Sequence, residues 1–267
     1  MTTPDGATIG YQTVGCGPPV IVIPGVLSMA ANYERLADAL AATFTVHTIE
    51  RRGHGRSSPQ TRDYCVATEC MDVSALREKT QSSYVFGHSY GGLIALETAR
   101  NNRLLKKIVV YEPGVSVNGS MPITWRINYE KLLAQNRPLD AFVAFSAAVG
   151  PTRAQNTPRW LMKLLLPLIM NRQDLRLKLG LLENNLREHQ QIANLNNTYQ
   201  NYAEVSADTL LLWGGKSDLS WVAPAIEKLS ATLPSAQVKQ FPRLNHFGPD
   251  QTGPREVAQA VRDHFAS

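Results

Sequence analysis

The stretch Tyr84-Val85-Phe86-Gly87-His88-Ser89-Tyr90-Gly91 decides the fold of this chain. Its first three residues form an apolar run typical of a buried strand, and residues 92–99 have a helical pattern. A serine two positions from a glycine on each side, where a strand meets a helix, predicts a sharp turn that exposes its hydroxyl. Glycine lets strand and helix approach without Cβ clashes, and the helix start offers free backbone N–H groups beside that hydroxyl.

The segments around this turn predict an α/β fold. Strand patterns occur at residues 8–14, 20–23, 44–49, 84–86, 107–111, 209–213 and 237–241, the first of them as an edge strand. Helical patterns separate most of these segments, at residues 31–42, 66–79, 92–99, 223–233 and 255–265. Strands that alternate with helices imply a mostly parallel central sheet with helices on both of its faces.

The alternation stops between residues 115 and 205, where only helical patterns occur, at 129–149, 160–170 and 175–195. The sequence therefore predicts a core of residues 1–114 and 206–267 that carries an all-helical cap insertion, 115–205. This insertion has ten Lys and Arg against six Asp and Glu, most of the net charge of +5. For its basic, Leu-rich helix we favour packing on the sheet edge, and a role at a membrane surface is the alternative.

Composition excludes several other classes of protein. The basic residues form no Lys/Arg run, which argues against a nucleic-acid partner. No apolar stretch approaches the length of a membrane span, so we expect no stable membrane insertion. The first residues lack the pattern of a signal peptide, and three cysteines are too few for a disulfide scaffold. We expect a cytoplasmic protein that is a monomer or a homodimer.

A serine hydroxyl needs a base to take its proton, and the base needs an acid to orient it. His246 is the predicted base because it follows the last strand, at the sheet edge where active-site groups converge. His54 and His88 are less suited, because one lies in a glycine-rich turn and the other directly precedes the serine. For the acid we favour Asp218, which follows residues 209–213 and precedes His246. Glu112 stays open as the alternative, because it also ends a strand.

The transition state of acyl transfer carries an oxyanion, which backbone N–H groups stabilise. Tyr90 offers one such group at the start of the helix. The second is expected from Val26, in the loop Pro24-Gly25-Val26-Leu27 after the first buried strand.

Together these pieces resemble the α/β-hydrolase superfamily, in its serine-nucleophile branch with a helical cap. The loop Glu50-Arg51-Arg52-Gly53-His54-Gly55-Arg56-Ser57 is similar to the Asp-x-x-Gly-x-Gly-x-Ser loop of that family, with Glu in place of Asp. The resemblance covers about residues 7–114 and 206–265. It implies that Ser89 is the nucleophile and His246 the base, with Tyr90 and Val26 as the oxyanion donors.

Two features depart from the family pattern. Pro24-Gly25 stands where the family usually has His-Gly. The loop that carries the acid is one residue longer than usual when counted from Gly214, which places Ser217 at the position of the acid. Counted from Gly215, Asp218 fits, so the choice between Asp218 and Glu112 stays open.

We therefore expect a serine hydrolase that cleaves a carboxylic ester, thioester or lactone through an acyl-enzyme, with no metal or organic cofactor. The expected substrate is a small molecule with an apolar acyl group. The residues expected to contact it are Leu27, Trp125, Trp160, Leu164 and Phe247, with Leu165, Leu168, Ile169 and Met170 beside them. The alternatives are a lyase or carbon–carbon bond hydrolase on the same triad, and a ligand receptor with little turnover.

Overall fold

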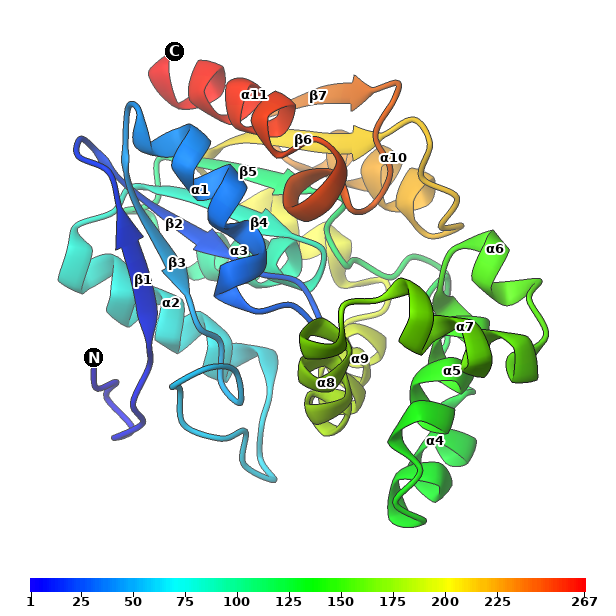
Figure 1. The fold of residues 1–267 in the computed structure, drawn as a ribbon. Coiled ribbons are helices and arrows are strands. Elements are labelled where there is room, and N and C mark those ends of the chain that lie inside the picture. The colour runs from blue at the N-terminus through cyan, green and yellow to red at the C-terminus, as the bar shows by residue number, and fades with distance from the viewer.

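A seven-stranded sheet forms the centre of the computed structural model, which describes residues 1–267 (Figure 1). The strands are β1 (Tyr11–Val14), β2 (Pro19–Ile23), β3 (Thr45–Ile49), β4 (Tyr84–His88), β5 (Lys107–Tyr111), β6 (Asp208–Gly214) and β7 (Ala236–Phe241). They lie in the order β1-β3-β2-β4-β5-β6-β7. Only β1 and β3 pair antiparallel, and every other neighbouring pair is parallel. The predicted mostly parallel α/β fold is confirmed.

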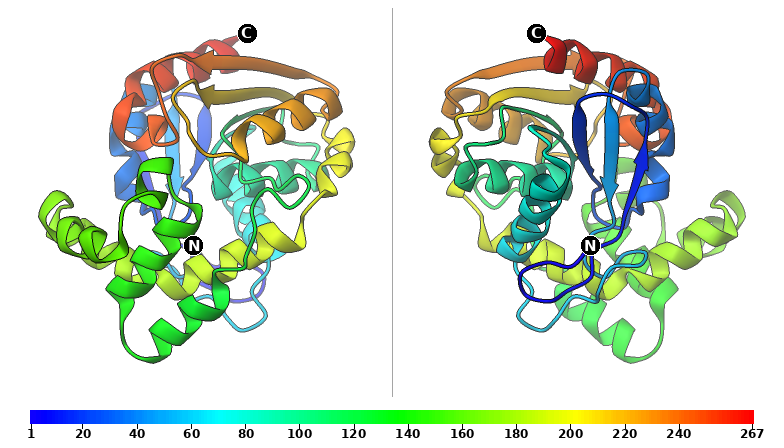
Figure 2. Two further views of the ribbon diagram at one scale, coloured as in Figure 1. Left: turned by 90° about the vertical axis from the view of Figure 1, so that its right-hand side faces the viewer. Right: turned by 90° about the vertical axis from the view of Figure 1, so that its left-hand side faces the viewer.

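Helices cover both faces of the sheet (Figure 2). On one face lie α1 (Glu34–Ala41) and α11 (Pro254–Ala266), and on the other lie α2 (Val66–Thr80), α3 (Tyr90–Asn101) and α10 (Val222–Thr232). The side chains of β2 alternate between the two cores, because successive residues of a strand point to opposite faces. Val20 and Val22 pack beneath α1 and α11, whereas Ile21 and Ile23 pack beneath α2 and α3.

Six helices between β5 and β6 form a separate layer, which we call the cap. They are α4 (Arg126–Ala134), α5 (Pro138–Val149), α6 (Thr152–Gln155), α7 (Arg159–Ile169), α8 (Arg172–Gly180) and α9 (Leu182–Asn194). Figure 1 shows this layer on the side to which the arrowheads of β4 to β7 point. The cap has its own small apolar cluster, which includes Tyr129, Phe142 and Phe145. The division of the chain at residues 115 and 205 stays a prediction.

The segment 129–149 differs from the single helix that its pattern predicts. It belongs to two helices, α4 and α5, separated at Asn136, whose φ is 55°. Pro138 is the first residue of α5. Proline has no N–H and its ring clashes with the preceding turn, so it begins a new helix more readily than it continues one.

Candidate active site

Ser89 lies at the sharp turn between β4 and α3, with φ 56° and ψ −121°. The turn requires glycine on both sides. A Cβ on Gly87 would lie 2.4 Å from the carbonyl oxygen of Gly91, and a Cβ on Gly91 would lie 2.1 Å from that of Ile23. The predicted sharp turn is therefore confirmed, and its strained backbone presents Ser89 at the carboxyl edge of the sheet.

Glu112 lies directly after β5 and holds the imidazole of His246. Its Oε2 atom is 2.7 Å from His246 Nδ1. The same carboxylate accepts a 3.0 Å hydrogen bond from the Ser217 hydroxyl and a 2.8 Å bond from the backbone N–H of Gly214. Glu112 is fully buried, whereas the side chain of His246 is 14% exposed. The buried carboxylate thus fixes the orientation of the partly exposed imidazole.

The preference for Asp218 as the partner of His246 needs correction. Asp218 turns toward the cap, where its Oδ2 atom accepts a 2.8 Å hydrogen bond from the backbone N–H of Thr152. Ser217, the residue at the expected acid position when the loop is counted from Gly214, bonds the Glu112 carboxylate. The carboxylate that contacts His246 comes instead from Glu112, directly after the neighbouring strand β5. Ser217 donates its hydroxyl proton to that carboxylate.

His88 connects two loops of the site. Its Nε2 atom is 2.8 Å from the carbonyl oxygen of His246, and its Nδ1 atom is 2.6 Å from the Tyr33 hydroxyl. Because a carbonyl only accepts, Nε2 carries the proton and Nδ1 accepts from Tyr33. Burial lowers the pKa of His88 well below its usual value, and the neighbouring His246 lowers it further. His88 is therefore a neutral structural link rather than a competing base.

The loop after β2 lies against Ser89. A Cβ on Gly25 would lie 3.1 Å from the Cβ of Ser89, so glycine leaves room for the close approach. Its N–H donates to the Tyr33 hydroxyl at 3.0 Å, and its carbonyl oxygen accepts from Arg51 Nη2 at 2.8 Å. That carbonyl shares a peptide unit with the N–H of Val26, which points the opposite way in a trans peptide. Arg51 thereby fixes the direction of the Val26 N–H.

Tyr90 is the first residue of α3, where a backbone N–H has no acceptor within the helix. Its ring is fully buried, and its hydroxyl is 3.0 Å from that of Tyr64. The structure therefore leaves the Tyr90 N–H beside Ser89 and places the side chain in the core. The roles of Tyr90 and Val26 as oxyanion donors stay predictions.

Arg51 forms a buried ion network that the sequence analysis missed. Its Nη1 atom lies 2.8 Å from Glu188 on α9 of the cap and 3.2 Å from Glu69 on α2. All three side chains are completely buried. Burial alone would lower the pKa of Arg51, but the charges of Glu188 and Glu69 outweigh it and raise that pKa. Burial raises the pKa of Glu69 to about 7, although Arg51 opposes the shift.

Some of the residues predicted to contact substrate lie near the site, and others are buried in the cap. Phe247 lies beside the site, with its ring centroid 5.6 Å from that of His246. Leu27 and Trp125 are buried together in the apolar cluster of the cap. Trp221, which the sequence analysis did not single out, also lies with its ring centroid 5.6 Å from that of His246.

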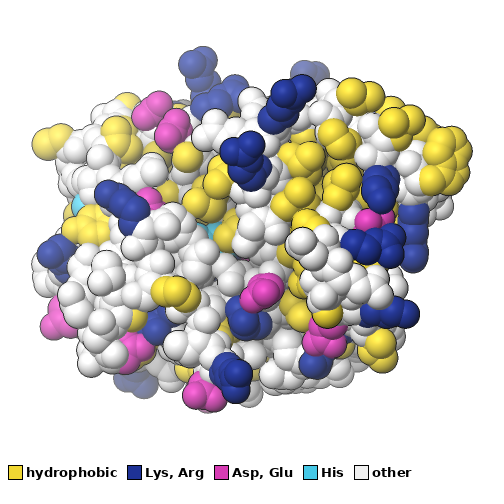
Figure 3. All heavy atoms as spheres, turned by 60° about the horizontal axis from the view of Figure 1, so that its bottom comes forward, with side chains coloured by type: hydrophobic (Ala, Val, Ile, Leu, Met, Phe, Trp, Pro, Cys, Tyr) yellow, Lys and Arg dark blue, Asp and Glu magenta, His cyan; other side chains and the backbone are white.

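Trp160 and Leu164 do not enclose a pocket. They are 71% and 60% exposed on α7. Figure 3 shows hydrophobic side chains gathered at the right-hand edge of the molecule. The helix turns Met162 inward instead, and Met162 is only 7% exposed. The expectation that Trp160 and Leu164 line the substrate site is corrected accordingly.

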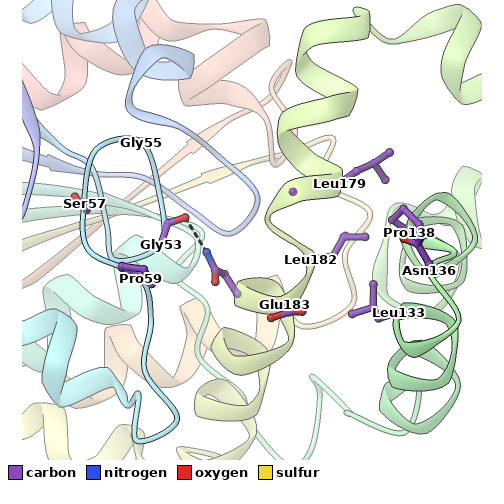
Figure 4. A pocket seen from close by; sticks show the side chains of 12 residues that line it. Gly53, Gly55, Ser57, Pro59, Leu133, Asn136, Pro138, Leu179, Leu182 and Glu183 are labelled. Atoms are coloured by element: carbon purple, nitrogen blue, oxygen red, sulfur yellow. Dashed lines mark hydrogen bonds between the residues drawn. The ribbon is translucent and has the colours of Figure 1, made fainter.

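Two cavities lie where the cap meets or borders the core, with volumes of about 480 and 530 Å³. Figure 4 shows the first, between the loop at Gly53 to Pro59 and the cap residues Leu133, Leu179 and Leu182. Asn184 closes one side of it with a 2.9 Å hydrogen bond to the carbonyl oxygen of Gly53. Neither cavity is lined by Ser89 or His246. No group of three or more His, Cys, Asp or Glu side chains is arranged as metal ligands.

A family model described as the alpha/beta hydrolase family matches residues 20–260. The chain belongs to this family. The curated relatives include the uncharacterized hydrolase YraK of Bacillus subtilis, 35% identical over 113 residues, which are 40% of this chain and 42% of that protein. In this match the chain thus spans less than half of its relative's length. A pimeloyl-[acyl-carrier protein] methyl ester esterase of Vibrio atlanticus is 23% identical over 90% of this alpha/beta hydrolase and 91% of the relative.

Solved structures of alpha/beta hydrolases have the same fold. One from Sphaerobacter thermophilus has a TM-score of 0.83 and 26% identity, and covers 99% of both chains. A meta-cleavage product hydrolase from Pseudomonas fluorescens has a TM-score of 0.68 and 17% identity, over 98% of this chain and 95% of that one. The second likeness concerns the fold alone.

Proposed function

We propose that this alpha/beta hydrolase cleaves a carboxylic ester, thioester or lactone through an acyl-enzyme on Ser89. The observation that carries the proposal is the buried Glu112 carboxylate 2.7 Å from His246 Nδ1, at the sheet edge that also presents the Ser89 turn. A histidine oriented by a buried carboxylate beside a strained serine is the arrangement that serine acyl transfer needs. The esterase among the relatives supports the same class of substrate.

In the first half of the reaction, Ser89 Oγ attacks the carbonyl carbon and His246 Nε2 takes the hydroxyl proton. The Val26 and Tyr90 N–H groups stabilise the oxyanion. His246 then gives the proton to the departing alcohol, thiol or lactone oxygen, and the acyl group remains on Ser89. His246 and Ser89 are not hydrogen-bonded to each other in the structure, and contacts of this kind often tighten only with substrate.

In the second half, a water molecule gives a proton to His246 and its oxygen attacks the acyl-enzyme. Collapse of the second tetrahedral intermediate releases the carboxylic acid and returns the proton to Ser89. Glu112 keeps the imidazole oriented and stabilises the imidazolium that forms in each half. Ser217 and the Gly214 N–H hold Glu112 through both steps.

The apolar rings of Trp221 and Phe247 next to His246 favour an apolar substrate group at the site. We therefore propose small or medium apolar acyl esters over charged ones. Trp221 and Phe247 would contact the acyl group, together with Leu27 in the loop beside Ser89.

The proposal is tested by treating the purified protein with a fluorophosphonate probe and mapping the adduct by peptide mass spectrometry. We expect labelling at Ser89 that is lost in the Ser89→Ala variant, followed by turnover in a series of p-nitrophenyl esters. An absence of labelling in folded protein would contradict an activated serine. Labelling without ester turnover, together with cleavage of a cyanohydrin or a diketone, would move the function to a lyase or a carbon–carbon bond hydrolase.

A further inference from the structure

Helix α7 carries a row of large apolar side chains on the outside of the cap. Trp160, Leu164 and Leu168 are spaced four residues apart and therefore lie on one side of the helix. They are 71%, 60% and 75% exposed, and Ile169 at the end of the helix is 72% exposed. The opposite side of α7 packs inward through Met162 and Leu166. We call Trp160, Leu164, Leu168 and Ile169 the α7 face.

The segment that contains the α7 face is strongly basic. Residues 151–180 hold six Lys and Arg and one Asp, and this excess of five equals the net charge of +5 of the whole chain. The arginines of this segment, Arg153, Arg159, Arg172 and Arg176, are all exposed and form no ion pair. Lys163 is paired with Asp140 at 2.9 Å. In Figure 3, Lys and Arg side chains border the hydrophobic ones at the edge where α6 and α7 lie.

We infer that the α7 face docks the protein on the surface of an anionic lipid bilayer. A short helix with Trp and Leu on one side and unpaired cations around it is the pattern of helices that lie in the interface plane. The leucines and Trp160 would enter the boundary of the acyl chains while the arginines contact the anionic headgroups. The helix lies along the membrane rather than across it, because no helix is long and apolar enough to span a bilayer.

A second copy of this chain fits the α7 face less well. Homodimers are usually two-fold symmetric, so the same patch would face itself. The unpaired arginines of both copies would then approach one another, and only one carboxylate of the segment, that of Asp174, could offset their charge in each copy. An anionic surface instead supplies the opposite charge to the arginines that adjoin the α7 face.

Sedimentation with vesicles tests this inference. The full-length protein is mixed with vesicles of phosphatidylcholine alone or of phosphatidylcholine with phosphatidylserine. We expect binding to the anionic vesicles that is at least tenfold tighter than to the neutral ones and that weakens as salt is added. Trp160 gives a second readout, since its fluorescence should shift to shorter wavelength on binding while that of the Trp160→Phe variant should not.

Matched variants separate the apolar contribution from the charged one. Leu164→Gln/Leu168→Gln should weaken vesicle binding at least tenfold, because burial of one leucine is worth about that factor or more. Its control is Ile127→Gln on α4, which removes an apolar side chain that is 81% exposed elsewhere on the cap.

Arg159→Gln/Arg172→Gln should weaken binding to anionic vesicles about twentyfold or more. The control is Arg103→Gln/Arg243→Gln, which removes two exposed, unpaired arginines of the core. This variant should bind anionic vesicles as the natural protein does.

Two kinds of result would overturn the inference. Equal binding to both kinds of vesicle, or binding that the Leu164→Gln/Leu168→Gln variant retains, would exclude the α7 face as an anionic lipid surface. Light scattering that shows a dimer, broken by the same variant and without vesicle binding, would assign the face to a second copy. Hydrolysis of soluble esters should be the same in all these variants, so failure here is separable from failure of the proposed activity.

Discussion

The sheet edge and helix α7 distribute polar and apolar groups in opposite ways. At the sheet edge, the Glu112 carboxylate is fully buried and accepts hydrogen bonds from His246, Ser217 and Gly214. On α7, Trp160 and Leu168 are more than 70% exposed. Buried polar groups and exposed apolar patches are the two departures from ordinary burial that carry information. One region is built for chemistry away from bulk water, and the other is built to meet a partner.

The largest effect should come from the buried carboxylate. Glu112→Gln should lower kcat/KM for an active ester about 10⁴-fold, because an amide cannot stabilise the imidazolium or hold the required tautomer of His246. Asp218→Asn, whose carboxylate bonds the cap backbone, should change it less than tenfold. Steady-state kinetics measure both, with circular dichroism to show that each variant is folded. A larger loss in Asp218→Asn than in Glu112→Gln would mean that Asp218 is the acid and that Glu112 is not.

The buried network of Arg51, Glu188 and Glu69, which joins the cap to the core, should respond to pH. Burial raises the pKa of Glu69 from 4.5 to about 7, so the folded state keeps a proton that the unfolded state has already lost. The free energy of unfolding should therefore fall as pH rises from about 4.5 to about 7. Glu69→Gln should lack this fall, and the difference between the two proteins should change by about 3 kcal/mol across that range.

Urea unfolding at a series of pH values measures this difference. The control is Glu78→Gln on the same helix, which removes an exposed carboxylate that forms no ion pair. It should follow the natural protein at every pH. A Glu69→Gln profile parallel to that of the natural protein would show that Glu69 does not hold the extra proton.

The smallest effect should lie on α7. Leu164→Ala should change the free energy of unfolding by less than about 0.5 kcal/mol, because its side chain is already 60% exposed. Met162→Ala in the same helix should cost about 2 kcal/mol, because Met162 is buried. Thermal unfolding compares the two variants. A loss at Leu164 as large as that at Met162 would mean that the α7 face is packed against the protein itself.

The sequence predicted the sheet edge better than the cap, for physical reasons. The Ser89 turn has a local signal, since Gly87 and Gly91 are required by contacts within a few residues and one neighbouring strand. The parallel strands also have local signals in their apolar runs. The carboxylate that contacts His246 was ambiguous in the sequence because one extra residue after Gly214 places Ser217 at the expected acid position. A strand pattern cannot show which of two adjacent loops supplies the carboxylate.

Two features had no usable signal in the chain. Arg51 and Glu188 are 137 residues apart, and nothing near either one indicates that they pair in the interior. The pattern of α7 predicted a helix correctly, but a periodic pattern does not show whether the larger apolar side meets the protein or the solvent. Only the placement of Met162 and Leu164 in space decides that.

The pairing of Arg51 with Glu188 limits how the cap can be exchanged between relatives. The carboxylate belongs to α9 of the cap, whereas the guanidinium belongs to the loop after β3 and also bonds the Gly25 carbonyl oxygen. A cap grafted from another protein would leave Arg51 short of a partner unless it brought a carboxylate to the position of Glu188. The loop beside Ser89 would then lose part of its support. A chimera must therefore change both sides of this ion pair at once.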